Sequence, residues 1–180
     1  MKTAEKWGRA GSGFLYYCPK DNTVLLLERS DAVMDPGVWG IPGGALKGTE
    51  GFYDEDELDE DFGEEELRSG AMNETEEELG HVPAEAVEVG RTTINFKGFK
   101  YTTFIMSVEP ETKAAITRDA RLNWESNNLG WFSLSDLPVN LHYGVAAAIK
   151  QFWNKDMDSS EASPLNPVSY QKRWDRWSNR

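Results

Sequence analysis

The sequence holds a single cysteine, Cys18, and only two histidines, His81 and His142. One cysteine excludes an intrachain disulfide, and so few histidines and cysteines argue against a His/Cys zinc site. No apolar run reaches the length of a membrane-spanning helix, and the charged residues 1–6 are not followed by a signal-peptide core. These absences predict a cytoplasmic protein without a membrane partner.

Positive charge is also scarce, since the chain has a formal net charge of −12. Residues 54–66 contain ten of the 31 acidic residues and no Lys or Arg, so the remainder is close to neutral. A chain without a broad basic surface is not expected to bind duplex nucleic acid. A polyanionic substrate would need metal ions to neutralise the negative field at its site.

The length of 180 residues suits one domain with a substantial core. We place this domain at residues 1–157, with an acidic insertion at 51–63. The insertion is expected to be an ordered loop or short helix at the domain edge, and the functional alternative is a lid or an extra cation site. The tail, residues 158–180, contains Trp174 and Trp177, which are expected to dock on the domain or on a second subunit. The tail therefore leaves a homodimer open.

The segment 65–79 is the strongest helix candidate, and Gly80 is the expected stop because glycine takes the left-handed conformation that closes many helices. Steps of about 100° per residue place Glu74, Glu77 and Glu78 on one face. A second face is expected to pack on the core, and it carries Arg68, Met72, Thr75 and Leu79. Asp61 with Glu64 is similar to a capping box at the start of this helix.

Like charges at these spacings repel each other, so the acidic face invites a compensating partner. Mg²⁺ prefers oxygen ligands and is usually held by one or two carboxylates together with substrate phosphates. The alternative is a solvated acidic face. The context favours a metal site, because Gly43 and Gly44 follow a short apolar run and allow close approach of the backbone to a ligand.

These residues resemble the signature of the Nudix hydrolases, G-x5-E-x7-R-E-U-x-E-E-x-G-U, in which U is aliphatic. Gly44 matches the first glycine, and the later positions are matched in register by Glu74, Glu77, Glu78 and Gly80. The chain departs from the signature elsewhere. Asn73 replaces the arginine, and either Glu50 or Glu65 takes the first glutamate position, depending on the direction of counting.

The resemblance covers about residues 10–155 and implies an α/β fold, the Nudix α/β/α sandwich with a mixed β-sheet. It implies hydrolysis of a pyrophosphate bond in a nucleoside diphosphate linked to another moiety, with Mg²⁺ or Mn²⁺ as cofactor. The resemblance implies that Glu77, Glu78 and the carbonyl of Gly44 are metal ligands. It implies that Glu74 is a metal ligand or the general base, and Glu125 is the competing candidate for the base. It also implies that Gly43 and Arg29 contact the substrate. Two alternatives remain open: a domain that binds a nucleotide without hydrolysing it, and an acidic protein-interaction module.

The remaining segments predict two hairpins, at residues 11–27 and 92–108, and a strand around Trp131 and Phe132. We expect residues 110–122 to be a connection and residues 134–138 to form a short helix. A last helix is expected over residues 142–154, with His142 as a surface or capping residue.

Overall fold

In the computed structural model of the chain, residues 10–47, 62–96 and 99–153 are described. The tail 158–180, residues 51–61 of the acidic insertion, Glu50 and Asp61 lie outside the described residues. The predictions for these segments therefore stay predictions.

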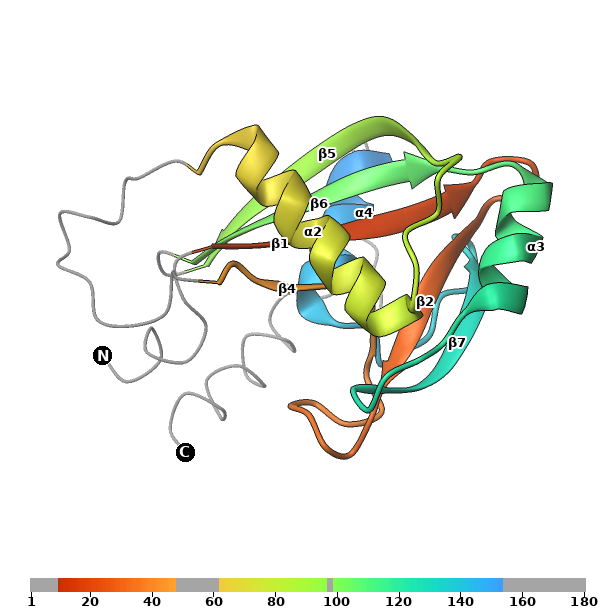
Figure 1. The fold of residues 1–180 in the computed structure, drawn as a ribbon, viewed down its shortest axis with the longest axis horizontal. Helices are drawn as coiled ribbons and strands as arrows, with labels where there is room; N and C mark the ends of the chain where they lie inside the picture. The colour runs from red at the N-terminus through yellow and green to blue at the C-terminus, as the bar shows by residue number, and fades with distance from the viewer. Residues whose placement is uncertain (1–9, 48–61, 97–98, 154–180) are drawn as a thin grey trace, which may run out of the picture.

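The described strands form one mixed sheet of seven strands in which β1 is central (Figure 1). The strands are β1 (Ala10–Cys18), β2 (Thr23–Arg29), β3 (Trp39–Gly40), β4 (Gly43–Ala45), β5 (Val87–Phe96), β6 (Phe99–Ser107) and β7 (Ser126–Ser133). The main order is β3-β2-β1-β6-β5, with β4 paired to β1 and β7 paired to β2. The sheet is mixed because β1 and β6 run parallel, whereas β1–β2 and β5–β6 are antiparallel.

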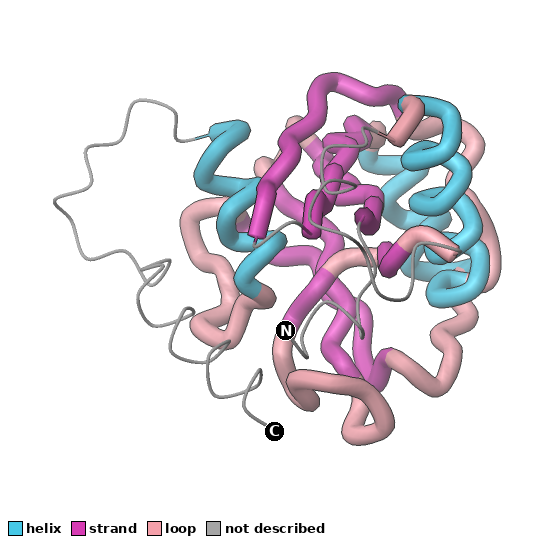
Figure 2. The backbone as a smooth tube through the Cα atoms, turned by 90° about the vertical axis from the view of Figure 1, so that its left-hand side faces the viewer, coloured by secondary structure: helices cyan, strands magenta, loops and turns pink. Residues whose placement is uncertain are grey.

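Helices cover both faces of this sheet, as the edge view shows (Figure 2). On one face, α2 (Glu64–Leu79) buries Ala71 and Leu79 against Phe14 and Phe104 of the sheet. On the other face, α4 (Tyr143–Trp153) packs in a second apolar cluster that includes Leu15, Ile105, Val145 and Ile149. Alternation along β1 produces the two clusters, since successive side chains of a strand point to opposite faces. The predicted α/β/α sandwich is confirmed.

The helix α2 lies close to β1 because its contact face is made of small residues. A Cβ added to Gly70 would lie 2.4 Å from Cδ2 of Leu46, and the hydroxyl of Ser12 donates a hydrogen bond of 2.6 Å to the carbonyl of Leu67. The helix ends as predicted, since Gly80 has φ 80° and its N–H bonds the Glu76 carbonyl. The acidic helix therefore has a fixed position along β1.

Its rotation about its own axis differs from the prediction. Met72, expected in the core, is 43% exposed, whereas Glu78, expected on the acidic face, is only 7% exposed. The close contact through Gly70 and Ala71 turns Met72 outward and brings Glu78 over the end of β4. The helix also begins differently, because its N-cap is Gly63 and no side chain caps it.

Two further segment predictions are wrong, and one strand was missed. Residues 110–122 contain a helix, α3 (Pro110–Asp119), which begins with proline in its first turn. Residues 134–138 form turns rather than a short helix. The strand β4 has two glycines among its three residues, so only its pairing with β1 identifies it.

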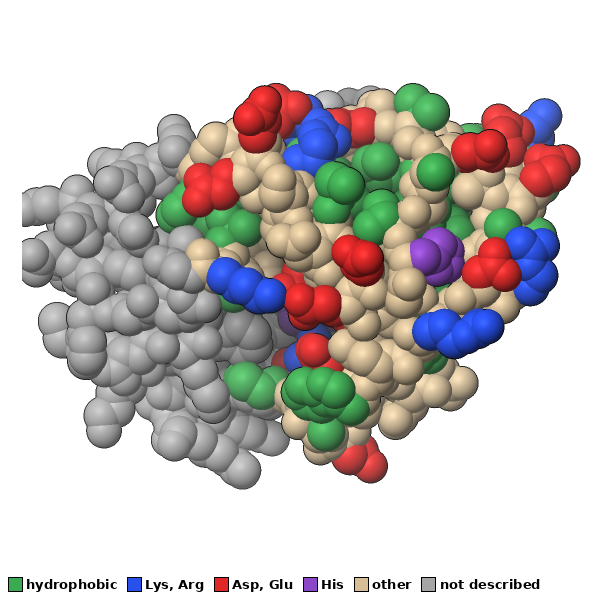
Figure 3. Space-filling view, in the orientation of Figure 1, with side chains coloured by type: hydrophobic (Ala, Val, Ile, Leu, Met, Phe, Trp, Pro, Cys, Tyr) green, Lys and Arg blue, Asp and Glu red, His purple; other side chains and the backbone are tan. Residues whose placement is uncertain are grey.

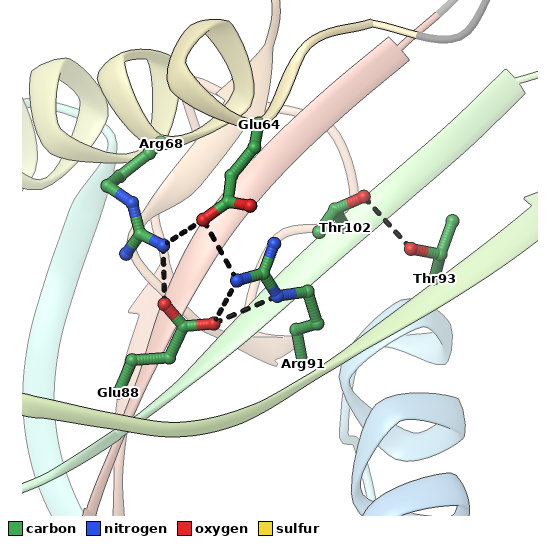
Figure 4. A network of polar contacts seen from close by, with 6 residues as sticks. All are labelled: Glu64, Arg68, Glu88, Arg91, Thr93 and Thr102. Atoms are coloured by element: carbon green, nitrogen blue, oxygen red, sulfur yellow. Dashed lines mark hydrogen bonds and ion pairs between the residues drawn. The ribbon is translucent and has the colours of Figure 1, made fainter.

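An ion-pair network ties the first turns of α2 to β5 (Figure 4). Arg68 pairs with Glu64 at 2.9 Å and with Glu88, while Arg91 pairs with Glu64 at 3.1 Å and with Glu88 at 2.7 Å. Both guanidinium groups also lie over the ring of buried Phe104, at 4.8 and 5.2 Å from its centroid. This network anchors the start of the acidic helix far from its last turn.

Candidate active site

The last turns of α2 lie against Gly43 and Gly44, the first two residues of β4, which are called the glycine turn below. Two of the predicted carboxylates contact this glycine turn directly. The N–H of Gly43 donates a hydrogen bond of 3.0 Å to Oε1 of Glu78. A Cβ added to Gly44 would lie 2.7 Å from Oε2 of Glu74, so only glycine leaves room for this carboxylate. The acidic face therefore points at the glycine turn, with Glu74 half-buried and Glu78 buried.

Burial is the largest cause of the raised pKa values of Glu74 and Glu78. Burial, together with the negative charges of Glu125 and Glu74, raises the pKa of Glu78 to about 8 against the opposing hydrogen bond from Gly43. Burial also raises the pKa of Glu74, with smaller contributions from Glu77 and Glu125. Three carboxylates from two segments of the chain, Glu74, Glu78 and Glu125, thus act on one another, and the charges of Arg29 and Lys47 oppose their effect.

Glu77 differs from Glu74 and Glu78 in its surroundings, because it is exposed and forms an ion pair with a lysine. Its Oε1 lies 3.1 Å from Nζ of Lys47, and both side chains are at least half exposed. Acidic side chains gather over α2 on this face, with basic side chains next to them (Figure 3). Among residues 10–47, 62–96 and 99–153, no three His, Cys, Asp or Glu side chains are close enough together to form a metal-binding group.

Glu125 and Arg29 reach the site from the other side. The carbonyl of Glu125 accepts a hydrogen bond of 2.8 Å from the N–H of Ser30, which fixes the loop before β7 next to the end of β2. Arg29, at that end of β2, donates from Nε to the Met34 carbonyl at 2.6 Å. The charge of Arg29 acts on Glu78, so this guanidinium lies within the electrostatic range of the acidic pair.

The chemistry of the donors fits a hard divalent cation. Glu74 and Glu78 offer carboxylate oxygens on one side of the glycine turn, and Mg²⁺ is usually bound by one or two carboxylates with substrate phosphates completing its shell. Burial is the main cause of the raised pKa values of both groups, and a cation bound next to them would lower these values. The carbonyl oxygen of Gly44 lies on the β1 side of the turn, 2.7 Å from where a Cβ on Gly11 would stand. Its role as a ligand stays a prediction.

A pocket opens next to the glycine turn, on the α4 face of the sheet. Gly43 and Gly44 line it together with Arg29, Phe99, Tyr101, His142 and Tyr143. The expected capping role of His142 is confirmed, since its Nδ1 accepts a hydrogen bond of 3.2 Å from the N–H of Gly144 at the start of α4. Its place in the pocket was not predicted, because the sequence shows no spacing that links residue 142 to residue 43.

The NUDIX domain family matches residues 9–152 of the chain. The chain belongs to the Nudix family. No curated protein matches it in sequence.

Several solved Nudix structures share the fold. The MutT Nudix hydrolase from Burkholderia pseudomallei is 22% identical with a TM-score of 0.51, and the match covers 80% of this chain and 97% of that one. The Ap4A hydrolase from C. elegans is 18% identical with a TM-score of 0.52, covering 81% and 96%. RenU from M. smegmatis is 24% identical with a TM-score of 0.53, covering 83% and 86%.

Membership of the Nudix family supports the prediction of an enzyme, a pyrophosphohydrolase acting on nucleoside diphosphate derivatives. Nudix hydrolases generally use divalent metals, which agrees with the oxygen donors at the glycine turn. In the described part of this Nudix chain, no helix has the length and apolar character to cross a bilayer.

The structure shows where the residues that depart from the Nudix signature lie. Asn73 and Glu65 are both exposed on α2. Arg68 faces β5 in the ion-pair network, so it does not replace the absent arginine at the carboxylates. Lys47 is the described basic residue that contacts the acidic face, through Glu77.

Proposed function

We propose that this Nudix protein hydrolyses a pyrophosphate bond of a nucleoside diphosphate linked to another moiety, with Mg²⁺ as cofactor and Mn²⁺ as an alternative. One observation supports the proposal above the others: Glu74 and Glu78 lie together at the glycine turn, within the field of Glu125. A solvated acidic face would leave these carboxylates apart and in water, whereas Glu78 is 7% exposed.

Glu74, Glu77 and Glu78 would hold the metal, with the Gly44 carbonyl as a further ligand. A bound divalent cation neutralises the phosphate oxygens and acidifies the attacking water. Glu77 is half exposed and needs only to leave Lys47 to take part. Once released, Lys47 would be free to bind a substrate phosphate.

Two carboxylates compete for the role of general base. Glu74 is half-buried at the glycine turn, and its raised pKa suits a group that takes up a proton. Glu125 is half-buried on the opposite segment, where its charge acts on both helix carboxylates. Arg29 and the backbone at Gly43 would bind the substrate next to these carboxylates. The lack of a broad basic surface in this acidic chain agrees with a small nucleotide substrate rather than duplex nucleic acid. We place the reaction in the cytoplasm.

A Glu78→Gln variant tests the assignment. Glutamine keeps an acceptor for the Gly43 N–H and resembles the protonated carboxyl that burial favours, so the fold is expected to stay intact. Turnover with Mg²⁺ or Mn²⁺ should fall to background across a panel of dinucleoside polyphosphates, nucleotide sugars, ADP-ribose, nucleoside triphosphates and capped RNA. Products would be identified by mass, with the circular dichroism spectrum as the control for folding. A fully active Glu78→Gln enzyme would remove Glu78 from the metal site.

A further inference from the structure

The pocket on the α4 face is large enough for a flat ring and shares the glycine turn with the carboxylates. Its volume is about 110 Å³, and Gly43 and Gly44 form part of its wall. Phe99, Tyr101 and Tyr143 give it an aromatic lining, as expected for a site that binds a planar group. A nucleotide whose phosphates lie at Glu74 and Glu78 would therefore place its base here.

His142 is held in one hydrogen-bonding state in this pocket. Its Nδ1 accepts the N–H of Gly144, so the proton of the neutral ring is on Nε2. Burial, followed by the nearby charge of Arg29, lowers the pKa of His142 to about 4. The ring therefore stays neutral at pH 7 and offers Nε2–H as a donor.

This donor is available to a ligand. No described residue accepts a hydrogen bond from Nε2 of His142. Within residues 10–47, 62–96 and 99–153, Thr92 Oγ1 is the one fully enclosed side-chain nitrogen or oxygen without a partner. Since His142 lines the pocket, its Nε2 is open to the pocket rather than sealed inside the protein.

Arg29 adds a second donor of the same kind. Its Nε donates a hydrogen bond to the Met34 carbonyl, and Arg29 is a lining residue of the pocket whose charge acts on both His142 and Glu78. A guanidinium donates and never accepts. The nitrogen-bearing side chains that face the ring are therefore donors, which favour a carbonyl edge and disfavour an exocyclic amino group.

We propose that this pocket selects a base with a carbonyl edge, through Nε2–H of His142 and the Arg29 guanidinium. The substrate is then a derivative of a keto base, hypoxanthine, guanine or uracil, rather than of adenine or cytosine. The inference rests on the proposed function for the placement of the phosphates, and it goes further by assigning His142 as a residue that determines specificity.

Binding of nucleosides without divalent metal tests the pocket separately from hydrolysis, because a nucleoside has no phosphate for the carboxylates to repel. Inosine and adenosine differ at the ring position where a carbonyl replaces an amino group, and titration calorimetry should show inosine bound at least about tenfold more tightly, the effect of about one hydrogen bond. Uridine against cytidine repeats the comparison on a smaller ring. Equal binding within each pair, or no binding of any of the four at millimolar concentration, would overturn the proposal and leave metal-dependent hydrolysis standing. Selective binding without turnover would support the pocket and remove the proposed function.

A His142→Asn variant identifies the residue responsible. Asparagine still caps α4 but is too short to place a donor in the pocket, so the preference for inosine over adenosine should fall to within about twofold. His81→Asn is the matched control, because it changes the only other histidine, whose charge acts on Asp119. An unchanged preference in His142→Asn, with a native spectrum, would exclude His142 from this role.

Discussion

Glu78 has a structural role in addition to the chemical role proposed for it. It is buried where α2 crosses the end of β4, and it accepts a hydrogen bond from the N–H of Gly43, the first residue of β4. A buried carboxylate without a counter-charge is unfavourable, and burial with nearby Glu125 and Glu74 raises its pKa to about 8. A divalent cation would remove this conflict.

Gly44 allows a test of the Glu74 position without touching the carboxylate. In Gly44→Ala the new Cβ would meet the end of the Glu74 side chain at 2.7 Å, so we expect Glu74 to move and the backbone to stay. Since a displacement of about 1 Å in an active site can cost about 100-fold in rate, kcat should fall by about ten- to 100-fold. Steady-state kinetics on the substrate found in the panel would measure it.

The control for this change is Gly63→Ala. A Cβ added to Gly63, the N-cap of α2, would meet nothing within 4 Å, so kcat is expected to stay within about twofold. If Gly44→Ala keeps full activity, the exact placement of Glu74 against the turn is not needed for the reaction.

At the scale of elements, α2 is held at both ends by different means. Its first turns are tied to β5 through Glu64, Arg68, Glu88 and Arg91, and its last turn ends at Gly80 beside Arg121, whose N–H bonds the Leu79 carbonyl at 2.8 Å. Between these ends, Gly70 and Ala71 lie against β1 and β4. The orientation of the carboxylates follows from where the whole helix is fixed.

Acid titration should report on the anchored end. Hydrogen bonds from Arg91 and then Arg68 lower the pKa of Glu64 to about 2 from 4.5. The stabilisation is therefore fully present above pH 4.5 and is lost as the pH falls from 4.5 through 2. We expect Glu64→Gln to lower the melting temperature at pH 7 and to flatten its decline over that window.

Glu66→Gln provides the comparison, because Glu66 is an exposed acid of the same first turn. Its melting temperature should follow that of the wild type across the window. Salt at 1 M should shrink the difference between wild type and Glu64→Gln, since exposed ion pairs are screened. Identical acid curves for wild type and Glu64→Gln would show that the network does not stabilise the helix.

At the scale of the molecule, the acidic site and the net charge of −12 predict that the fold is linked to divalent cations. A cation that binds only the folded chain stabilises it by about 2.7 kcal/mol at 100 times its Kd. For a chain of this length this corresponds to a rise of about 5–10 °C in Tm. Calorimetry with and without MgCl₂ would measure the rise, and EDTA should reverse it.

NaCl at the same ionic strength separates binding from screening, because it should reproduce only a small part of the rise. The Glu78→Gln variant should lose most of the remainder. A rise in Tm that is equal in MgCl₂ and NaCl would argue that no specific cation site exists.

Much of this architecture follows from local sequence. Runs of consecutive apolar and small residues in β1, β2 and β6 specify these strands, and Gly80 ends α2 because glycine adopts positive φ without strain. The Nudix family was also recognisable, since Gly44, Glu74, Glu77 and Glu78 occur in one linear pattern. α3 was missed because only Thr112 and Ile116 of its residues are buried, too few to produce an apolar stripe.

The tertiary structure decided what no linear pattern contains. The rotation of α2, which buries Glu78 and exposes Met72, depends on how closely Gly70 approaches Leu46, the residue that follows β4. The pairing of β4 with β1, and the pocket that His142 lines together with Gly43 and Gly44, join segments that are distant in the sequence. Sequence determined which groups are candidates for the chemistry, because residue type and local spacing are local properties. Only packing determined which of these groups are buried and what they face.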